Sequence, residues 1–229
     1  MSRLVEKIPM VWRDRYRSQW HRIKSIGQKG GVERIMWMLN RRSPPQAQDG
    51  AIRLHLGCGK VDHPKFTNID LLPYPHVHYL RPIDDLKPFA AESVDLIYAS
   101  HCLEHFPFRK VPAVLREWHR VLKPGGTLRL SVPNFDTVVD AYLASGREIG
   151  CVHQVVVGGQ DYKHNFHFVL FNRRSLTAAL EQCGFVEVRH WVPGSEEFTT
   201  FDDFSRTVFE VGSREIPVSL NLEARKTQP

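Results

Sequence analysis

Residues 51–70, with the sequence AIRLHLGCGKVDHPKFTNID, contain the pattern that decides the fold. Apolar and polar residues alternate as far as Leu56, which predicts a β-strand. Gly57 and Gly59 then break the pattern, because glycine allows a sharp turn and lets a ligand approach the backbone closely. A second short strand follows and ends on the carboxylate of Asp70. This arrangement predicts a nucleoside site in which the acid accepts hydrogen bonds from the ribose hydroxyls.

The spacing within this stretch argues against a dinucleotide. A dinucleotide-binding turn has a third glycine, a helix that opens on the pyrophosphate, and an acid about 20 residues further on. Here Asp62 occupies the position of the third glycine, and Asp70 follows Gly57 by only thirteen positions. So short a connection leaves no room for a full crossover helix, which needs about a dozen residues or more. A nucleoside with a short zwitterionic tail, such as S-adenosylmethionine, fits the pattern better.

The remainder of the chain alternates between strand-like and helix-like segments. This alternation predicts an α/β fold with a doubly wound sheet, whose ligand lies at the carboxyl ends of the strands. Residues 146–170 are rich in glycine, histidine and aromatic residues and are predicted to be irregular. The predicted strands are 93–100, 127–133, 185–191 and 218–224, and the predicted helices are 109–122, 136–145 and 175–183.

Composition and charge predict a globular domain with a basic extension. Charged residues make up 24% of the 229 residues and hydrophobic residues 42%, which is typical of a soluble protein. Residues 1–50 contain eleven lysines and arginines but four acidic residues, whereas the rest of the chain is nearly neutral. Nucleic acid is therefore not the expected partner of the main body. We expect a basic helical extension and linker over 1–45 and a catalytic domain over 46–229.

The basic extension allows two interpretations. Over residues 1–42, Trp12, Tyr16 and Trp20 recur at helical spacing among arginines, and a second apolar cluster follows. These residues either form helices that pack on the core or lie on an anionic membrane surface, with docking on nucleic acid as a third, less favoured interpretation. The four cysteines lack a C-x-x-C pair, and no apolar run approaches the roughly 18 residues of a membrane span. The expected location is the cytoplasm, with the inner face of the membrane as the place where the extension would bind.

Five segments carry a resemblance to a known family: LHLGCG, NIDLLP, SVDLIYASHCLEHF, VLKPGGTLRLSVPNF and SLNLEARK. In this order and spacing they resemble a class I SAM-dependent methyltransferase of the branch related to the type 11 methyltransferases. The resemblance covers about residues 51–225 and implies a Rossmann-like sheet of seven strands that ends in a reversed hairpin. The family's acid two residues before the first glycine is His55 here. The backbone of Leu56 and Gly57 is therefore expected to hold the methionine amino group.

The resemblance implies S-adenosylmethionine as the cofactor. Asp70 would hold the ribose, while Asp84 or Asp85 would accept from the adenine amino group and the Leu86 amide would pair with the ring. Leu71 would cover the adenine. The implied cofactor residues are Leu56, Gly57, Cys58, Gly59, Asp70, Leu71, Asp84, Asp85, Leu86, Ser100 and His101.

Histidines suggest the catalytic group. Residues 101–105 read H-x-x-E-H, an inverted zinc-protease signature, but a strand precedes them directly and Pro107 follows, so no zinc helix is expected. No metal site is therefore predicted. His105, His164 and His167 are instead candidates for a general base, because the pKa of histidine suits proton removal near neutral pH. The alternative is that these side chains only hold the structure together by hydrogen bonds.

The function implied by the resemblance is methyl transfer to a small-molecule or glycan-type acceptor, at oxygen, in polysaccharide biosynthesis. A histidine would remove the acceptor proton. The alternative is a SAM-binding or degenerate methyltransferase-like module that regulates or scaffolds without catalysis, because the family's acid and third glycine are both missing at His55 and Asp62.

Overall fold

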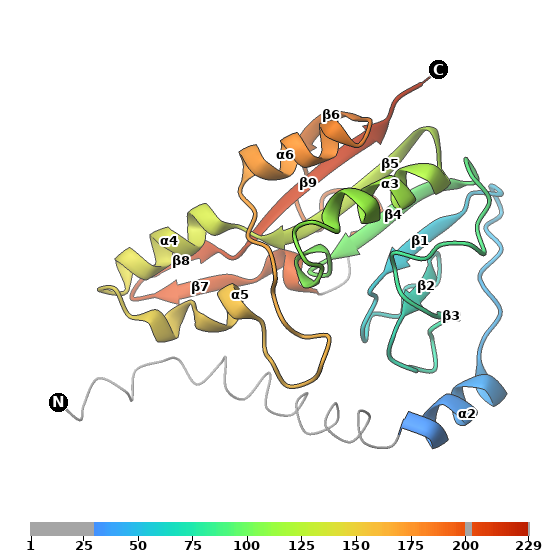
Figure 1. The fold of residues 1–229 in the computed structure, drawn as a ribbon, viewed down its shortest axis with the longest axis horizontal. Coiled ribbons are helices and arrows are strands. Elements are labelled where there is room, and N and C mark those ends of the chain that lie inside the picture. The colour runs from blue at the N-terminus through green and yellow to red at the C-terminus, as the bar shows by residue number, and fades with distance from the viewer. Residues whose placement is uncertain (1–29, 200–202, 229) are drawn as a thin grey trace.

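A mixed sheet forms the centre of the protein in the computed structural model, which describes residues 30–199 and 203–228 (Figure 1). Its order is β3-β2-β1-β4-β5-β9-β6. Neighbours from β3 to β5 are parallel, whereas β9 runs antiparallel to both β5 and β6. The Rossmann-like sheet of seven strands with a reversed last pair is therefore confirmed. The strands are β1 (Arg53–Leu56), β2 (Thr67–Asp70), β3 (Tyr79–Leu80), β4 (Val94–Ser100), β5 (Leu122–Pro133), β6 (Phe185–His190) and β9 (Ser219–Lys226).

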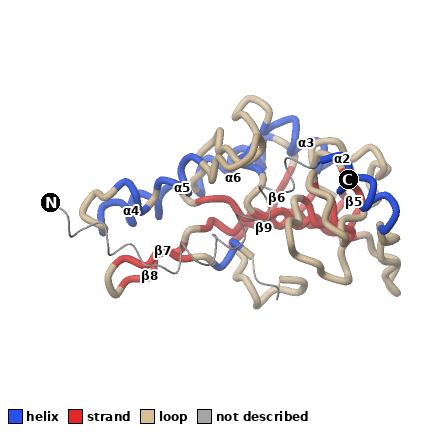
Figure 2. The backbone as a smooth tube through the Cα atoms, turned by 90° about the horizontal axis from the view of Figure 1, so that it is seen from below, coloured by secondary structure: helices blue, strands red, loops and turns tan. Residues whose placement is uncertain are grey.

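Helices α3 (Val111–Val121) and α6 (Arg173–Gln182) cover one face of the sheet, and Figure 2 shows them above the strands. α3 has Pro112 in its first turn, where a missing N–H costs nothing, and it buries Trp118 completely. After α6 the chain turns at Gly184, whose φ of +89° favours glycine. Both helices form close to their predicted bounds, because their apolar spacing and end signals agree. Their side chains join those of the strands in the main core.

The opposite face of the sheet carries aromatic side chains. Phe66, Tyr98 and Trp191 are buried there, and Phe198 from the loop after β6 packs against them. His55 belongs to this face, with its ring centroid 5.1 Å from that of Tyr98. Burial lowers the pKa of His55 to about 4, so the side chain is neutral near pH 7. The residue at the position of the family's acid thus carries no charge.

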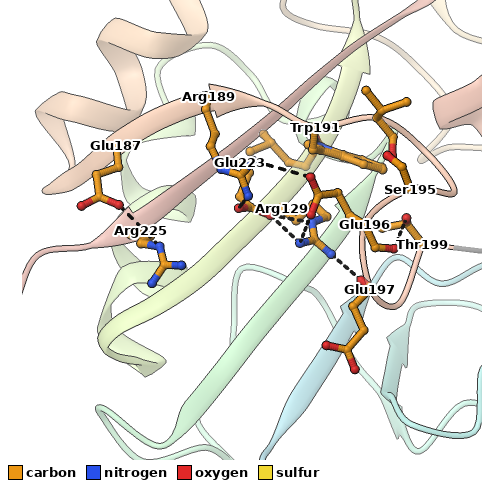
Figure 3. Close-up of polar contacts among 12 residues, drawn as sticks. Arg129, Glu187, Arg189, Trp191, Ser195, Glu196, Glu197, Thr199, Glu223 and Arg225 are labelled. Atoms are coloured by element: carbon orange, nitrogen blue, oxygen red, sulfur yellow. Dashed lines mark hydrogen bonds and ion pairs between the residues drawn. The ribbon is translucent and has the colours of Figure 1, made fainter.

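A buried ion-pair network joins β5, β6 and β9 on the same face (Figure 3). Arg129 donates to Glu223 through Nε at 2.7 Å and through Nη2 at 2.5 Å, and its Nη1 donates to the carbonyl of Glu197 at 2.6 Å. Arg189 donates to the second carboxylate oxygen of Glu223 at 2.6 Å. Trp191 lies beside the guanidinium of Arg129, 5.7 Å from carbon to ring centroid. We refer to these contacts as the Arg129–Glu223 network.

A second, smaller layer extends from the sheet (Figure 1). Helix α4 was predicted, whereas the hairpin of β7 and β8 was not, and two short helices interrupt the predicted irregular region. The hairpin and α4 share a separate apolar cluster. These elements are α4 (Phe135–Ala144), η3 (Ile149–Cys151), α5 (His153–Val157), η4 (Phe204–Arg206), β7 (Val208–Val211) and β8 (Arg214–Pro217).

Helix α2 (Gly30–Asn40) is attached to the body through Trp37, whose Nε1 donates to the carbonyl of Val77 at 2.7 Å. The opposite face of the helix is apolar and exposed. Residues 1–29, which hold the rest of the basic segment, lie outside the described residues. Across residues 30–199 and 203–228, no helix is long and apolar enough to cross a bilayer. The exposed apolar residues of α2 at positions i, i+3, i+4 and i+7 are Val32, Ile35, Met36 and Leu39.

Candidate functional site

The carboxyl ends of β1, β2 and β4 meet at one edge of the sheet, where α/β folds bind ligands. The turn after β1 needs its glycines, since Gly57 and Gly59 have φ angles of +64° and +53°. A Cβ at Gly57 would lie 3.1 Å from that of Cys102. The Gly57 amide donates to the carbonyl of Ile69 at 2.9 Å. The sheet thus uses this amide, while the backbone of the turn faces the edge where a ligand would lie.

Asp70 is tied to the glycine turn. Its carboxylate accepts from the amides of Gly59 and Leu72, each at 2.8 Å. Burial raises the pKa of Asp70, and these amide hydrogen bonds offset part of that rise. Each carboxylate oxygen can accept more than one hydrogen bond, so both retain acceptor capacity for hydroxyl groups. Asp70 is therefore both a support of the turn and a possible ribose ligand.

Two tyrosines near Asp70 were not predicted. Burial, followed by the charge of Asp70, raises the pKa of Tyr74 to about 12, and burial and Asp70 also raise the pKa of Tyr162. His76 stacks on Tyr74 and contacts the carbonyl of Gly59 at 2.9 Å through Nε2. Neither tyrosine belongs to a recognisable sequence motif. Tyr74 precedes β4 and Tyr162 follows β5, and only the fold brings both of them near Asp70.

The loop that carries Tyr162 is fastened to the sheet. At Gly158 a Cβ would lie 2.6 Å from the carbonyl oxygen of Asn165, so the close approach of the two loop arms requires glycine. The amide of Phe168 donates to the carbonyl of Glu104 at 2.9 Å, and His105 Nδ1 lies 3.0 Å from the carbonyl of Phe166. The loop thus brings its own side chains to the end of β4.

Three histidines surround a buried carboxylate at the end of β4. Glu104, in the 3-10 helix η2 (Leu103–His105), has no solvent exposure. Its Oε1 lies 3.3 Å from His101 Nδ1 and 3.9 Å from His167 Nε2. One ligand atom each of Glu104, His105 and His167 lies within 4.8 Å of the others. The sequence placed Glu104 beside His101 and His105 in the H-x-x-E-H run but did not predict that His167 joins them.

Electrostatics set the charge of this cluster. Burial acts to raise the pKa of Glu104, but His101, His105 and His167 together outweigh it, so the pKa is lowered. Burial lowers the pKa of His167, although Glu104 acts in the opposite direction.

The residues predicted to bind adenine lie in different surroundings. The Leu86 amide donates to Oε1 of Glu117, on α3, at 2.8 Å and so is already paired. Asp85 forms an ion pair with Arg81 at 2.6 Å, and Asp84 and Asp85 line a surface depression together with Glu117. These contacts do not support an adenine role for this segment.

The other predicted cofactor residues lie at several places around the ligand edge of the sheet. Leu71 is exposed directly after Asp70, as a residue that covers a ligand would be, whereas Cys58 is buried within the turn. Ser100 lies on the strand face of Tyr98. His101 contacts Ser219 Oγ at 2.7 Å through Nε2. Its two ring nitrogens thus face Ser219 and Glu104.

His164 lies apart from the buried cluster on the exposed part of the loop. Burial of part of the ring lowers its pKa, followed by the charge of Lys163 and of His105. His164 can therefore act as a neutral base at the rim of the site.

Comparisons with known proteins give a family match and a fold match. Residues 67–130 match the family model described as a methyltransferase domain. The SAM-dependent methyltransferase of Archaeoglobus fulgidus superposes with a TM-score of 0.50 at 15% identity, over 95% of this chain and 99% of that chain.

Further solved structures are similar at lower TM-scores. A Methanosarcina mazei SAM-dependent methyltransferase gives 0.49 at 17% identity, over 80% of this chain and 96% of its own. The Burkholderia thailandensis 1,6-didemethyltoxoflavin-N1-methyltransferase, solved with S-adenosylhomocysteine, gives 0.48 at 15% identity over 95% and 88%. No curated protein matches the sequence. The family match over residues 67–130 and the fold likeness agree with each other, since both are to methyltransferases.

Proposed function

We propose that the protein transfers the methyl group of S-adenosylmethionine to a hydroxyl oxygen of a small-molecule or glycan-type acceptor, in polysaccharide biosynthesis. The observation that carries this proposal is the cluster of Glu104, His105 and His167 at the carboxyl end of β4, on the same sheet edge as Asp70. Hydroxyl methylation needs a group that accepts the proton of the acceptor hydroxyl, and the histidines of this cluster are such groups.

Position accounts for most of the expected rate. Holding the sulfonium in line with the acceptor oxygen converts a bimolecular step into an effectively unimolecular one. The oxygen lone pair forms the new bond to the methyl carbon, and the electrons of the broken S–C bond stay on sulfur. The acceptor proton leaves to a histidine, for which His105, His164 and His167 are the candidates.

The test uses deuterated S-adenosylmethionine with a panel of sugars, oligosaccharides and phenols, analysed by mass spectrometry. We expect a labelled methyl ether, and we expect His105→Gln to lower the rate by about 10²- to 10⁴-fold, the usual contribution of acid–base catalysis. His190→Gln is the matched control, because this exposed ring also contacts a backbone carbonyl, that of Asn221. Cofactor binding without methyl transfer to any acceptor would favour the regulatory or scaffold alternative. Labelling at nitrogen or carbon alone would contradict the hydroxyl proposal.

We also propose that residues 1–45 form an extension that holds the cytoplasmic protein at an anionic membrane surface. The apolar face of α2 supports this proposal, since Val32, Ile35 and Leu39 are exposed while Arg34 and Arg41 are on the same helix or directly after it.

Sedimentation with phosphatidylserine vesicles tests the membrane proposal. Ile35→Glu with Leu39→Glu should reduce vesicle binding, because each change replaces an apolar contact by a charge that the surface repels. High salt should reduce it as well, since the Debye length is about 10 Å at 0.1 M. Val192→Glu is the control, because Val192 is also exposed, at 63%, but lies outside α2. Equal binding by all proteins would exclude α2 from any membrane contact.

A further inference from the structure

We propose that Glu104, His105 and His167 bind one divalent first-row transition metal ion, with His101 beside them. Metal binding itself stands independently of the methyl acceptor. The role given to the ion below rests on the proposed hydroxyl methylation.

The first argument is the state of the Glu104 carboxylate. Both of its oxygens are buried, and neither makes a hydrogen bond with any described residue. The contact from His101 at 3.3 Å is an ion-pair distance without the alignment of a hydrogen bond. A buried ionised carboxylate is costly unless it is paired, hydrogen-bonded or coordinated to a metal. The neighbouring histidines are therefore its only partners among the described residues, and a metal ion would coordinate the oxygens that lack a well-aligned hydrogen bond.

The second argument is the orientation of the histidines. His105 Nδ1 lies 3.0 Å from the carbonyl of Phe166, and His167 Nδ1 lies 2.8 Å from the carbonyl of Val155. Carbonyl oxygens only accept, so Nδ1 carries a proton in both rings, and Nε2 is the nitrogen that offers a lone pair when the ring binds a metal ion. Metal-binding histidines are held in this way by a hydrogen bond from the second ring nitrogen. His167 Nε2 lies 3.9 Å from Oε1 of Glu104, so the second nitrogen of this ring is on the side of the carboxylate.

The third argument is the chemistry of the donor set. Imidazole nitrogen and carboxylate oxygen suit zinc, manganese, iron and cobalt, whereas magnesium and calcium prefer oxygen alone. Metal–ligand bonds of about 2.0–2.2 Å span ligand atoms at most about 4.4 Å apart. The observed separations are all within 4.8 Å, close to this limit. Two histidines and one carboxylate would leave coordination positions open.

The three ligands also come from two segments that the ion would join. Glu104 and His105 belong to η2, and His167 belongs to the loop over residues 158–168. This differs from a zinc-protease site, where a long helix carries both histidines and the glutamate acts on water. η2 has three residues, so the protease interpretation lacks its helix.

A role in the proposed reaction follows from the open positions. An acceptor hydroxyl bound to the ion would lose its proton more readily, because a cation lowers the pKa of a bound oxygen acid. The oxygen lone pair then forms the bond to the methyl carbon, the S–C electrons remain on sulfur, and the proton passes to His164 or to water. His105 and His167 would be ligands in this arrangement, which leaves His164 as the histidine base.

Metal content and manganese binding test the proposal on the full-length protein. We expect about one equivalent of zinc, manganese or iron by elemental analysis of protein purified without chelator. After treatment with EDTA, titration with MnCl₂ followed by electron paramagnetic resonance should show one site. Glu104→Gln and His167→Gln should each weaken manganese binding by more than the 10- to 100-fold that outer partners of a metal site contribute. His190→Gln is the control and should bind manganese as the unaltered protein does.

Binding of S-adenosylhomocysteine, measured by calorimetry, separates this proposal from the proposed function and reports on folding. If either Glu104→Gln or His167→Gln fails to fold and so no longer binds S-adenosylhomocysteine, the manganese affinity of the other variant tests the metal site. Absence of metal from the purified protein, together with no manganese binding by the EDTA-treated protein, would overturn the metal site while leaving the methyltransferase intact. Unchanged manganese affinity in a folded Glu104→Gln protein would also overturn it. Manganese binding without detectable hydroxyl methylation would keep the metal site and reject the proposed acceptor chemistry.

Discussion

Replacing Asp70 by alanine is expected to abolish measurable binding of S-adenosylmethionine and S-adenosylhomocysteine while the protein remains folded. Two charge-assisted hydrogen bonds to the ribose would be lost, each worth about 1.5–3 kcal/mol. The carboxylate also holds the amides of Gly59 and Leu72, so the glycine turn would lose its support. The two losses act in the same direction, and we expect an affinity loss of at least about 100-fold.

Titration calorimetry with S-adenosylhomocysteine measures this effect, and circular dichroism verifies the fold. Asp70→Asn should be nearly as damaging, because an amide oxygen can accept from one of the two N–H groups while its NH₂ faces the other. Asp62→Ala is the matched control, since this acid is in the same connection but forms an exposed pair with Arg42. Wild-type affinity in Asp70→Ala would remove Asp70 from the cofactor site.

Replacing Glu223 by alanine is expected to destabilise the protein by about 3–5 kcal/mol, the usual effect of breaking a buried ion pair by removing one partner. Arg129 is 7% exposed, and its guanidinium would lose the carboxylate to which its Nε and Nη2 donate hydrogen bonds (Figure 3). Arg189 is half exposed and can turn toward water, so the free-energy cost comes from the buried charge of Arg129. Urea unfolding followed by tryptophan fluorescence gives the free energy of unfolding.

The neighbouring pair of Arg225 and Glu187 provides the control. Both side chains are at least half exposed, with a shortest N–O distance of 3.5 Å, and exposed pairs contribute about 0–1 kcal/mol. Glu187→Ala should therefore change the free energy of unfolding little. Replacing Arg129 and Glu223 together by leucine should recover part of the stability lost in Glu223→Ala, because no unpaired buried charge remains. A loss below about 1 kcal/mol in Glu223→Ala would mean that Arg129 reaches water in solution.

Strong local patterns made most of the fold predictable. β4 is a mostly apolar run, β1 alternates apolar and polar residues, and α3 and α6 have apolar spacing with clear end signals, so local sequence and tertiary packing agree. β3 contains two residues and has no pattern of its own; it forms because Tyr79 and Leu80 lie beside the end of β2. The hairpin of β7 and β8 is rich in charged residues, and it is stabilised by packing on α4 that the sequence does not reveal.

The candidate site was predictable only where its residues are neighbours in the chain. Spacing alone identified the glycine turn and Asp70, because the two strands and their connection fit within twenty residues. Glu104 and His105 are adjacent, but His167 reaches them through a loop whose path depends on its contacts with η2. Tyr74 and Tyr162 approach Asp70 from different segments for the same reason. The sequence also did not reveal that the Leu86 amide donates to Glu117, on a helix further along the chain.

The position of β9 between β5 and β6 has a consequence for biosynthesis. β6 is made before β9, yet β9 is the strand with which it pairs in the described sheet. Until β9 is in place, the edges of β5 and β6 that it will occupy present unpaired backbone groups that could pair with other chains. The sheet closes when residues 219–226 emerge and insert between two strands already made. Chaperone contact during translation would be most valuable in that interval.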